Sequence, residues 1–249
     1  MPRRLLVLLV LVFALVPGTA SAGPAIVGGG DADQPYPFAV SLHTSAGKLF
    51  CAGALIAPTW VVTAAHCAFD KAPASISVRS GTNDVAKGGE VGQVADIVVN
   101  PAFDTQKPAG DIALLRLATP AKAAPIALAT AASPGTATRI LGWGQTCPKV
   151  DCGDIPANLQ QLDTHIVEGA KCTSGFDGTA ELCTDNPGGK SGACFGDSGG
   201  PEIVRAGDHW LLAGVTSRPG NNDPVCATAP SIYTSVVAYA PWIAEKTKA

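Results

Sequence analysis

Short apolar runs rich in Val, Ile and Leu recur along almost the whole chain, and Gly, Pro, Asn and Asp separate them. Helical periodicity is nearly absent from these segments. Regularly spaced short strands with turn residues between them are typical of β-barrels and β-sandwiches, so an all-β fold is predicted. The runs that read as strands are 38–42, 53–57, 60–63, 75–79, 94–99, 112–117, 138–143, 161–167 and 210–216. One helix is expected, from about Val236 to Lys246, with Pro241 in its first turn.

The amino terminus reads as a secretory signal peptide. Arg3 and Arg4 precede an apolar run from Leu5 to Val16, and small residues follow it. This run of 12 residues is shorter than the roughly 20 that a membrane-spanning helix needs. The paired arginines leave a twin-arginine export route open, although the strongly apolar run favours the general secretory route. We therefore expect residues 1–22 to be a signal peptide and the mature protein to be secreted, extracellular and without a membrane segment.

Residues 23–25 read as a short propeptide ahead of an apolar Ile26, which leaves residues 26–249 as the mature domain. Its 224 residues are enough for one large all-β unit or two small units that share an interface. Removal of the two leader arginines leaves 15 of the 17 basic residues against 20 acidic ones, a net charge of −5. A mildly acidic chain without a basic run lacks the electrostatic surface that nucleic acids need.

All 8 cysteines follow the leader, and an even number of cysteines in an exported chain indicates disulfides. Their spacing does not choose among the pairings that are possible. Zinc binding is the weaker interpretation, because Cys147 and Cys152 have no second cysteine pair or His-rich partner to complete a ligand set. A calcium site is not indicated either, because Glu90 lacks a clear second acidic ligand in a matching loop. No metal and no cofactor is therefore predicted.

Ser198 lies in the glycine-rich stretch from Gly196 to Pro201. A serine hydroxyl is a weak nucleophile at neutral pH, so it needs a nearby base and hydrogen-bond donors for the oxyanion that forms. Glycines let backbone N–H groups approach such an oxyanion closely. The alternative is a glycine-rich loop with a solvent-facing serine, and the choice depends on whether a matching His and Asp are present.

His66 and Asp111 are the candidates for these partners. His66 follows a predicted hairpin with Cys51 and Cys67 at its outer ends, where a disulfide would fix the adjacent backbone. Asp111 begins the apolar run 112–117, so it is expected to be buried, and a buried carboxylate needs a partner. A turn-capping role is the alternative for Asp111.

The other histidines and two other acids have weaker settings. His43, His165 and His209 are expected to be structural. Asp84 and Asp104 compete with Asp111 for the acid role, but neither begins an apolar run. These comparisons leave His66, Asp111 and Ser198 as the candidate catalytic residues.

Four motifs together resemble the chymotrypsin and trypsin family of serine proteases. They are Ile26–Gly29, Thr63–Cys67, Asp111–Leu115 and Gly196–Pro201, which occur in the family's order of His, Asp and Ser. The resemblance covers nearly all of the mature chain. It implies two six-stranded antiparallel β-barrels with a C-terminal helix, a catalytic cleft between the barrels, and the activity of a secreted serine endopeptidase. Residues 26–249 are then the protease domain.

The resemblance implies a role for each matching residue. Ser198 is the nucleophile, His66 takes and returns its proton, and Asp111 orients the imidazole. The backbone N–H groups of Gly196 and Ser198 form the oxyanion hole, and Ser217 contacts the buried acid.

Maturation and disulfides follow from the same resemblance. After cleavage, the ammonium of Ile26 is expected to pair with Asp197 and order the oxyanion loop. The implied disulfides are Cys51–Cys67, Cys172–Cys183 and Cys194–Cys226, which leaves Cys147–Cys152.

The substrate pocket departs from the family pattern. Where trypsin-like members carry a carboxylate, this chain has Gly192, followed by Ala193, with Ser231 at another wall position. The other wall reads Ser217-Arg218-Pro219, and Pro219 has no N–H to donate to a substrate backbone. With no acid expected in the pocket, an uncharged residue is predicted on the amino side of the cleaved bond, the P1 position. Asp223, in the longer loop 220–225, would overturn this prediction if it supplied a charge.

Two other functions fit the same sequence. A catalytically silent binding module on the same fold is one, although the chain retains the three candidate catalytic residues. An esterase or amidase that acts on small substrates is the other, because the same nucleophile chemistry would serve and the altered Arg218-Pro219 strip leaves this function open. As a protease the chain would act on proteins or peptides, bind protein protease inhibitors and exist as a monomer.

Overall fold

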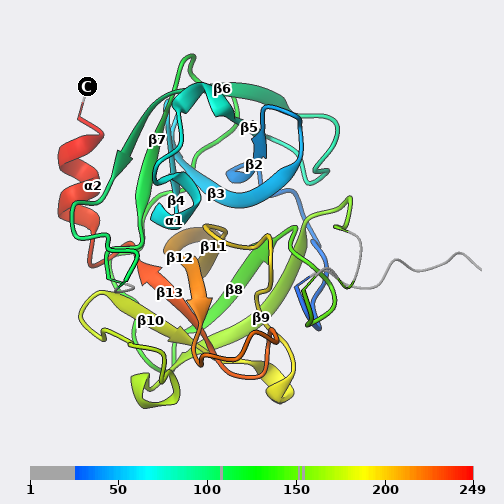
Figure 1. Ribbon diagram of the computed structural model, residues 1–249, viewed down its shortest axis with the longest axis vertical. Helices are drawn as coiled ribbons and strands as arrows, with labels where there is room; N and C mark the ends of the chain where they lie inside the picture. Colours follow the sequence, from blue (N-terminus) through cyan, green and yellow to red (C-terminus); the bar gives the residue numbers. More distant parts are fainter. Residues whose placement is uncertain (1–25, 107–108, 151, 153–154, 249) are drawn as a thin grey trace, which may run out of the picture.

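The computed structural model describes residues 26–106, 109–150, 152 and 155–248. The predicted signal peptide and propeptide, residues 1–25, lie outside the described residues. The described residues form two β-barrels with one helix at the C-terminal end (Figure 1). No helix among them combines the length and the apolar character that a membrane crossing requires.

The first barrel closes in the strand order β2-β3-β4-β7-β6-β5, with every neighbouring pair antiparallel (Figure 1). Its strands are β2 (Ala39–Thr44), β3 (Leu49–Ala57), β4 (Trp60–Thr63), β5 (Ile76–Ser80), β6 (Glu90–Val99) and β7 (Ala113–Leu117). Apolar side chains such as Leu42, Leu55 and Leu114 are fully buried inside it. Gly53 is required on β3, because a Cβ there would lie 2.8 Å from a methyl group of Val61.

The second barrel is closed by the pairing of β8 with β9, which joins the two ends of the order β9-β10-β13-β12-β11-β8. Its strands are β8 (Ala137–Gly142), β9 (Gln160–Val167), β10 (Glu181–Thr184), β11 (Pro201–Ala206), β12 (His209–Pro219) and β13 (Ser231–Ser235). The short strand β1 (Gly30–Asp31) pairs with β9 from outside this order. The prediction of two six-stranded antiparallel barrels is confirmed.

Three strands of the second barrel were absent from the sequence prediction. β10 is only 4 residues long, and β11 begins with a proline and contains Glu202 and Arg205. β13 has Ser, Thr and Tyr at most of its positions, yet all of them are buried. The search for apolar runs did not detect these strands, because many of their residues are polar. A barrel can nevertheless bury polar side chains that find hydrogen-bond partners inside it.

The C-terminal helix α2 spans Ala240–Lys246 and starts four residues later than predicted. Pro241 lies in its first turn, as expected. Residues 236–239 form turns instead, because the Val236 N–H bonds to the Ala213 carbonyl and the Val236 side chain is buried. Ile243 packs α2 against the core that includes the first barrel (Figure 1). The remaining helical segments are α1 (Ala65–Ala68), η1 (Pro73–Ser75), η2 (Gly169–Lys171) and η3 (Pro187–Gly189).

Four disulfides cross-link the described chain. They join Cys51 to Cys67, Cys147 to Cys152, Cys172 to Cys183 and Cys194 to Cys226. These are the pairings that the family resemblance implied, so that prediction is confirmed. Two of them flank the candidate site, because Cys67 follows His66 directly and Cys194 precedes Ser198 by four residues.

Candidate active site

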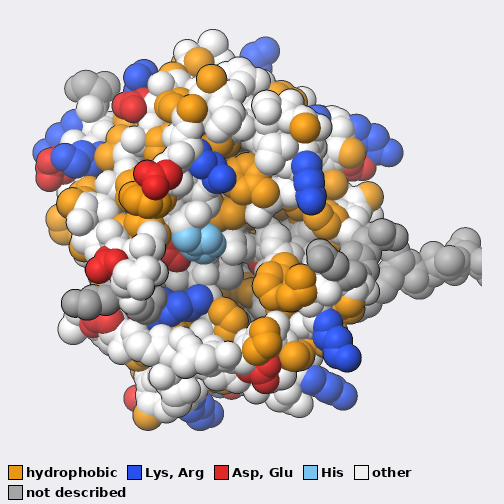
Figure 2. Space-filling view, in the orientation of Figure 1, with side chains coloured by type: hydrophobic (Ala, Val, Ile, Leu, Met, Phe, Trp, Pro, Cys, Tyr) orange, Lys and Arg blue, Asp and Glu red, His pale blue; other side chains and the backbone are white. Residues whose placement is uncertain are grey.

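The pairing of β4 with β7 brings His66 and Asp111 together. Thr63, the last residue of β4, lies opposite Ala113, the first residue of β7. The chain leaves β4 into α1, which carries His66, and Asp111 lies two residues before β7. Neighbouring strand ends therefore place the two side chains side by side. Figure 2 shows a histidine exposed in the hollow between the two barrels.

The two residues are joined by two hydrogen bonds. His66 Nδ1 lies 2.8 Å from Asp111 Oδ2, and the His66 backbone N–H donates to Asp111 Oδ1 at 2.9 Å. The His66 side chain is 38% exposed, whereas that of Asp111 is 5% exposed. A buried acid thus fixes the orientation of an imidazole whose other face is open to solvent.

Asp111 has two further donors from the second barrel. The Ser217 hydroxyl donates to Oδ2 at 2.6 Å, and the Thr234 hydroxyl donates to the Asp111 carbonyl at 2.8 Å. Burial raises the pKa of Asp111, but the hydrogen bonds and charge of His66 and the hydrogen bond from Ser217 together lower it by more. The pKa of Asp111 therefore lies below its ordinary value. Asp111 is therefore ionised at neutral pH. The Ser217 contact was expected, whereas the Thr234 contact was not.

Ser198 is held next to this pair through its backbone. Its carbonyl accepts the Ala52 N–H at 2.8 Å and lies 3.7 Å from Cys67 Sγ. The following Gly199 donates to the Thr216 carbonyl, and a Cβ there would overlap the Thr63 hydroxyl, so no other residue fits. Within the described residues, the Ser198 hydroxyl makes no hydrogen bond to His66. Catalytic hydrogen bonds of this kind often form only when substrate is bound.

The loop before Ser198 presents two unbonded backbone donors. In the described part of the chain, the N–H groups of Gly196 and Ser198 have no protein acceptor. Gly196 has a φ of +99°, a conformation that glycine tolerates and other residues rarely adopt. Its neighbours are tied down, because Gln145 donates to the Phe195 carbonyl and Asp197 donates to the Cys194 carbonyl. These two N–H groups are thus free to bind an anionic oxygen.

Asp197 belongs to this loop, directly before Ser198, and is only 1% exposed. Its carboxylate accepts the Gly144 N–H at 2.7 Å and the Cys194 N–H at 2.9 Å. Burial raises its pKa to about 7, against the lowering effect of these two hydrogen bonds. Ile26 is also buried, in the core of the second barrel, and the next residue pairs with the pocket loop through the Val27 carbonyl and the Gly192 N–H at 2.9 Å.

A pocket with a volume of about 330 Å³ opens beside Ser198. Its lining residues are Val150, Ala193, Cys194, Phe195, Ser198, Thr216, Ser217, Arg218, Pro219, Asp223, Pro224, Cys226 and Ser231. Ala193, Ser217, Arg218, Pro219 and Ser231 therefore lie where the sequence predicted. Phe195 and Val150, which are both exposed, were not predicted as lining residues.

Gly192 is not one of the residues that line this pocket, but it adjoins them, because a Cβ there would lie 3.6 Å from Oγ of the lining residue Ser231. Its role in the substrate pocket stays a prediction. The expectation that no acid lines the pocket is wrong, since Asp223 of loop 220–225 does so. Both oxygens of Asp223 accept hydrogen bonds, one from the Val225 N–H in this loop and one from the Thr228 hydroxyl just after it.

Arg218 does not present a free charge to the pocket. Its guanidinium binds both carboxylate oxygens of Glu181, at 2.6 and 3.0 Å. Sequence reasoning missed Glu181 entirely. The available signal was weak: an acid between Ala180 and Leu182, two residues before a cysteine, which would need a partner if it were buried.

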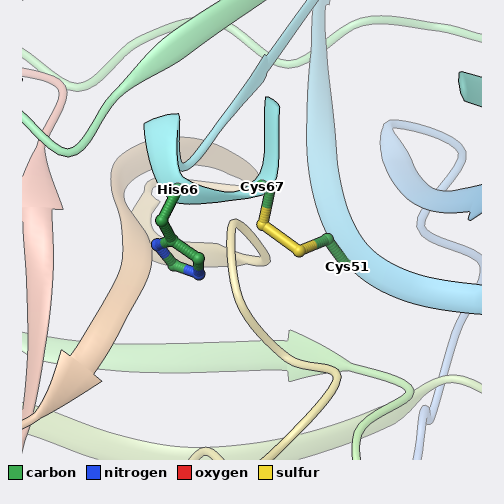
Figure 3. Close-up of side chains that lie close together, drawn as sticks. All are labelled: Cys51, His66 and Cys67. Carbon is green, nitrogen blue, oxygen red and sulfur yellow. A yellow bond between two sulfur atoms is a disulfide. The ribbon is translucent and has the colours of Figure 1, made fainter. Parts of the chain in front are cut away.

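Three potential metal-binding side chains cluster at the site: Cys51, His66 and Cys67 (Figure 3). The two sulfur atoms form a disulfide, so neither is the thiolate that zinc binds. His66 Nδ1 is occupied by Asp111. This cluster therefore supports no metal site.

Two antiparallel barrels with an acid-bound histidine and a glycine-flanked serine between them define a chymotrypsin-like protein. The sequence model of the family described as Trypsin matches residues 26–243, so the chain belongs to the trypsin family. The chain is also 38% identical over 229 residues to a curated protein named Trypsin from Saccharopolyspora erythraea. That similarity covers 86% of this chain and 94% of the relative.

Proposed function

We propose that this protein is a secreted serine endopeptidase that works through an acyl-enzyme intermediate. The observation that carries the proposal is the hydrogen-bonded pair of His66 and ionised Asp111, with the backbone of Ser198 tied directly beside it. Membership of a protease family supports protein or peptide substrates.

The proposed reaction has two halves. Ser198 Oγ attacks the carbonyl carbon of the scissile peptide, and His66 Nε2 accepts the hydroxyl proton while Asp111 stabilises the imidazolium. The carbonyl oxygen becomes an oxyanion that the N–H groups of Gly196 and Ser198 bind. Cleavage of the C–N bond passes the proton from His66 to the leaving amine and leaves an ester on Ser198. Water then attacks this ester with His66 as the base, which releases the acid product and restores Ser198.

Activation by cleavage after Ala25 forms part of the proposal. The carboxyl group of Asp197 is buried with two backbone donors and, among the described residues, no cation. A buried carboxylate without a counter-charge is costly, so a new ammonium at Ile26 would stabilise its ionised form. Ile26 is already buried in the same barrel. Pairing of the two groups would order the loop that carries Gly196 and Ser198.

An uncharged P1 residue is the preference we propose. Ala193, Thr216 and Ser231 give the pocket a neutral wall, and the charge of Arg218 is neutralised by Glu181. Asp223 is the competing feature, but its two oxygens already accept hydrogen bonds from its own loop. Burial of an apolar side chain gains about 25 cal/mol for each Å² removed from water.

Peptides that differ only at P1 test this proposal. Phe, Tyr or Leu at P1 should be cleaved faster than Arg or Lys, and the Asp223→Asn variant should keep that order. Efficient cleavage after Arg or Lys that disappears in Asp223→Asn would instead identify Asp223 as the counter-charge. Hydrolysis confined to small esters or amides would favour the esterase alternative. A protein that binds peptides and cleaves none would favour the silent module.

A further inference from the structure

Arg218 makes a dense set of polar contacts behind the pocket wall. Nη1 and Nη2 bind the two oxygens of Glu181, whose side chain is 2% exposed. Nε and Nη2 also donate to the Ser174 carbonyl at 3.2 Å, and Nη2 donates to the Gly175 carbonyl at 3.1 Å. The arginine thus joins β12 to β10 and to the loop that precedes β10.

The same guanidinium reaches the catalytic acid through one hydroxyl group. Arg218 Nη1 lies 3.2 Å from Ser217 Oγ, and Ser217 Oγ lies 2.6 Å from Asp111 Oδ2. A guanidinium can only donate, so Ser217 Oγ must accept from Arg218. Its single hydrogen is then left for Asp111. Arg218 therefore donates both to Glu181 and to Ser217, and Ser217 donates in turn to Asp111.

We propose that Glu181 and Arg218 form a charged clamp that positions Ser217, and through it Asp111 and His66, for the proposed reaction. This inference rests on the proposed function. Arg218 and Glu181 are positioning residues, because neither touches the reacting atoms. The clamp needs the fork geometry of arginine, since a lysine cannot bind both oxygens of Glu181 and also donate to Ser217.

The clamp also places two opposite charges near the catalytic pair. Three elements bring titratable groups close to Asp111. His66 of α1 bonds to it directly, Tyr239 next to α2 interacts with its charge, and Arg218 of β12, paired with Glu181, is linked to it by Ser217. Burial raises the pKa of Tyr239, and the charges of Glu181, Asp177 and Asp111 raise it further, so it is neutral at working pH.

Four variants test the clamp: Arg218→Met, Arg218→Lys, Glu181→Gln and the double variant Arg218→Met with Glu181→Leu. Arg205→Met is the matched control, because Arg205 is exposed on the β11–β12 hairpin and stacks on Trp210. Each variant is measured for kcat and KM, for thermal unfolding, and for the NMR chemical shift of the His66 Nδ1 proton, which reports on its hydrogen bond to Asp111. The NMR measurement needs no turnover, so it reports on the clamp even if the proposed peptidase activity fails.

The clamp predicts that Arg218→Met and Arg218→Lys each lower kcat about tenfold, with a smaller change in KM. Arg218→Met and Glu181→Gln should each move the NMR signal of the His66 Nδ1 proton, because Ser217 and the Asp111 carboxylate that it bonds lose their fixed position, whereas Arg205→Met should leave this signal unchanged. The double variant should recover stability, because it removes a buried ion pair instead of breaking one, yet its kcat should stay low. A double variant with normal kcat, or Arg218→Met and Glu181→Gln variants in which the signal of the His66 Nδ1 proton does not move, would overturn the proposal.

Discussion

The backbone N–H and the ring Nδ1 of His66 bind different oxygens of Asp111, at 2.9 and 2.8 Å. One carboxylate thus fixes both the main chain and the imidazole of the same residue. Because Nδ1 is occupied, Nε2 is the nitrogen that is left for Ser198. The order of β4 and β7 in the first barrel is what makes this double contact possible.

Asp111→Asn should lower kcat by about ten-thousandfold, because an amide can donate to Nδ1 and hold the wrong tautomer of His66. The fold should survive, since Ser217 and Thr234 can still bond to the side chain and backbone at this position. Steady-state kinetics on a peptide substrate measures the loss. Asp104→Asn is the control and should leave kcat unchanged, because among the described residues the Asp104 side chain bonds only to the Gln106 N–H. Substantial activity in Asp111→Asn would show that Asp111 is not the orienting acid.

Glu202 makes stability depend on pH. It is fully buried on β11 and accepts the Thr184 hydroxyl at 2.9 Å, and burial raises its pKa to about 7 from 4.5. The pKa of Glu202 in the folded protein lies above its unfolded-state value, so folding favours the protonated carboxyl. The contribution of Glu202 to the free energy of unfolding is therefore complete below pH 4.5 and is lost as pH rises through 7. The loss is on the order of 3 kcal/mol.

Glu202→Gln should therefore flatten the fall in melting temperature as pH rises from 4.5 to about 7, the interval that separates the two pKa values. Wild type and variant must be compared in the same processing state, because burial shifts the pKa of Asp197 in the same direction. Equal slopes for the two proteins would mean that Glu202 does not titrate in this interval.

Ser231→Asp should move the P1 preference towards Arg and Lys, because Ser231 lines the pocket and a carboxylate there would face the substrate side chain. This position suits a test better than Gly192, whose φ of +154° would strain any side chain. The ratio of kcat/KM for matched Arg and Leu peptides measures the change. Ser45→Asp, on the exposed turn between β2 and β3 of the first barrel, is a control for the added charge. An unchanged ratio in Ser231→Asp would place P1 elsewhere.

Much of this architecture could be predicted from the sequence, because apolar runs between turn residues mark strands whether or not their partners are known. The motif around Ser198 and the run after Asp111 likewise carry their own local signal. The Glu181–Arg218 pair could not be predicted, because the two residues lie far apart in sequence. They come within reach of each other only because β10 and β12 pair with opposite edges of the same strand, β13. The position of Asp223 depends on loop packing, which periodicity does not describe.

Cleavage before Ile26 should be required for activity. Mass spectrometry of the active protein should find Ile26 at the amino terminus, because only a free ammonium can pair with Asp197. Asp197→Asn should lower kcat in the cleaved protein, since the loop with Gly196 loses its anchor. Activity should also fall at high pH as the Ile26 amine loses its proton. An active species that still carries Ala25 would contradict this mechanism.

Covalent labelling of Ser198 tests the central claim most directly. A phosphonylating or sulfonylating reagent should modify one site, and peptide mapping should place it on Ser198, because only this hydroxyl is expected to have a base and an oxyanion hole beside it. Ser198→Ala should take up no label and hydrolyse no peptide, while its melting temperature stays near that of wild type. A label on another residue, or peptide hydrolysis by Ser198→Ala, would contradict the account.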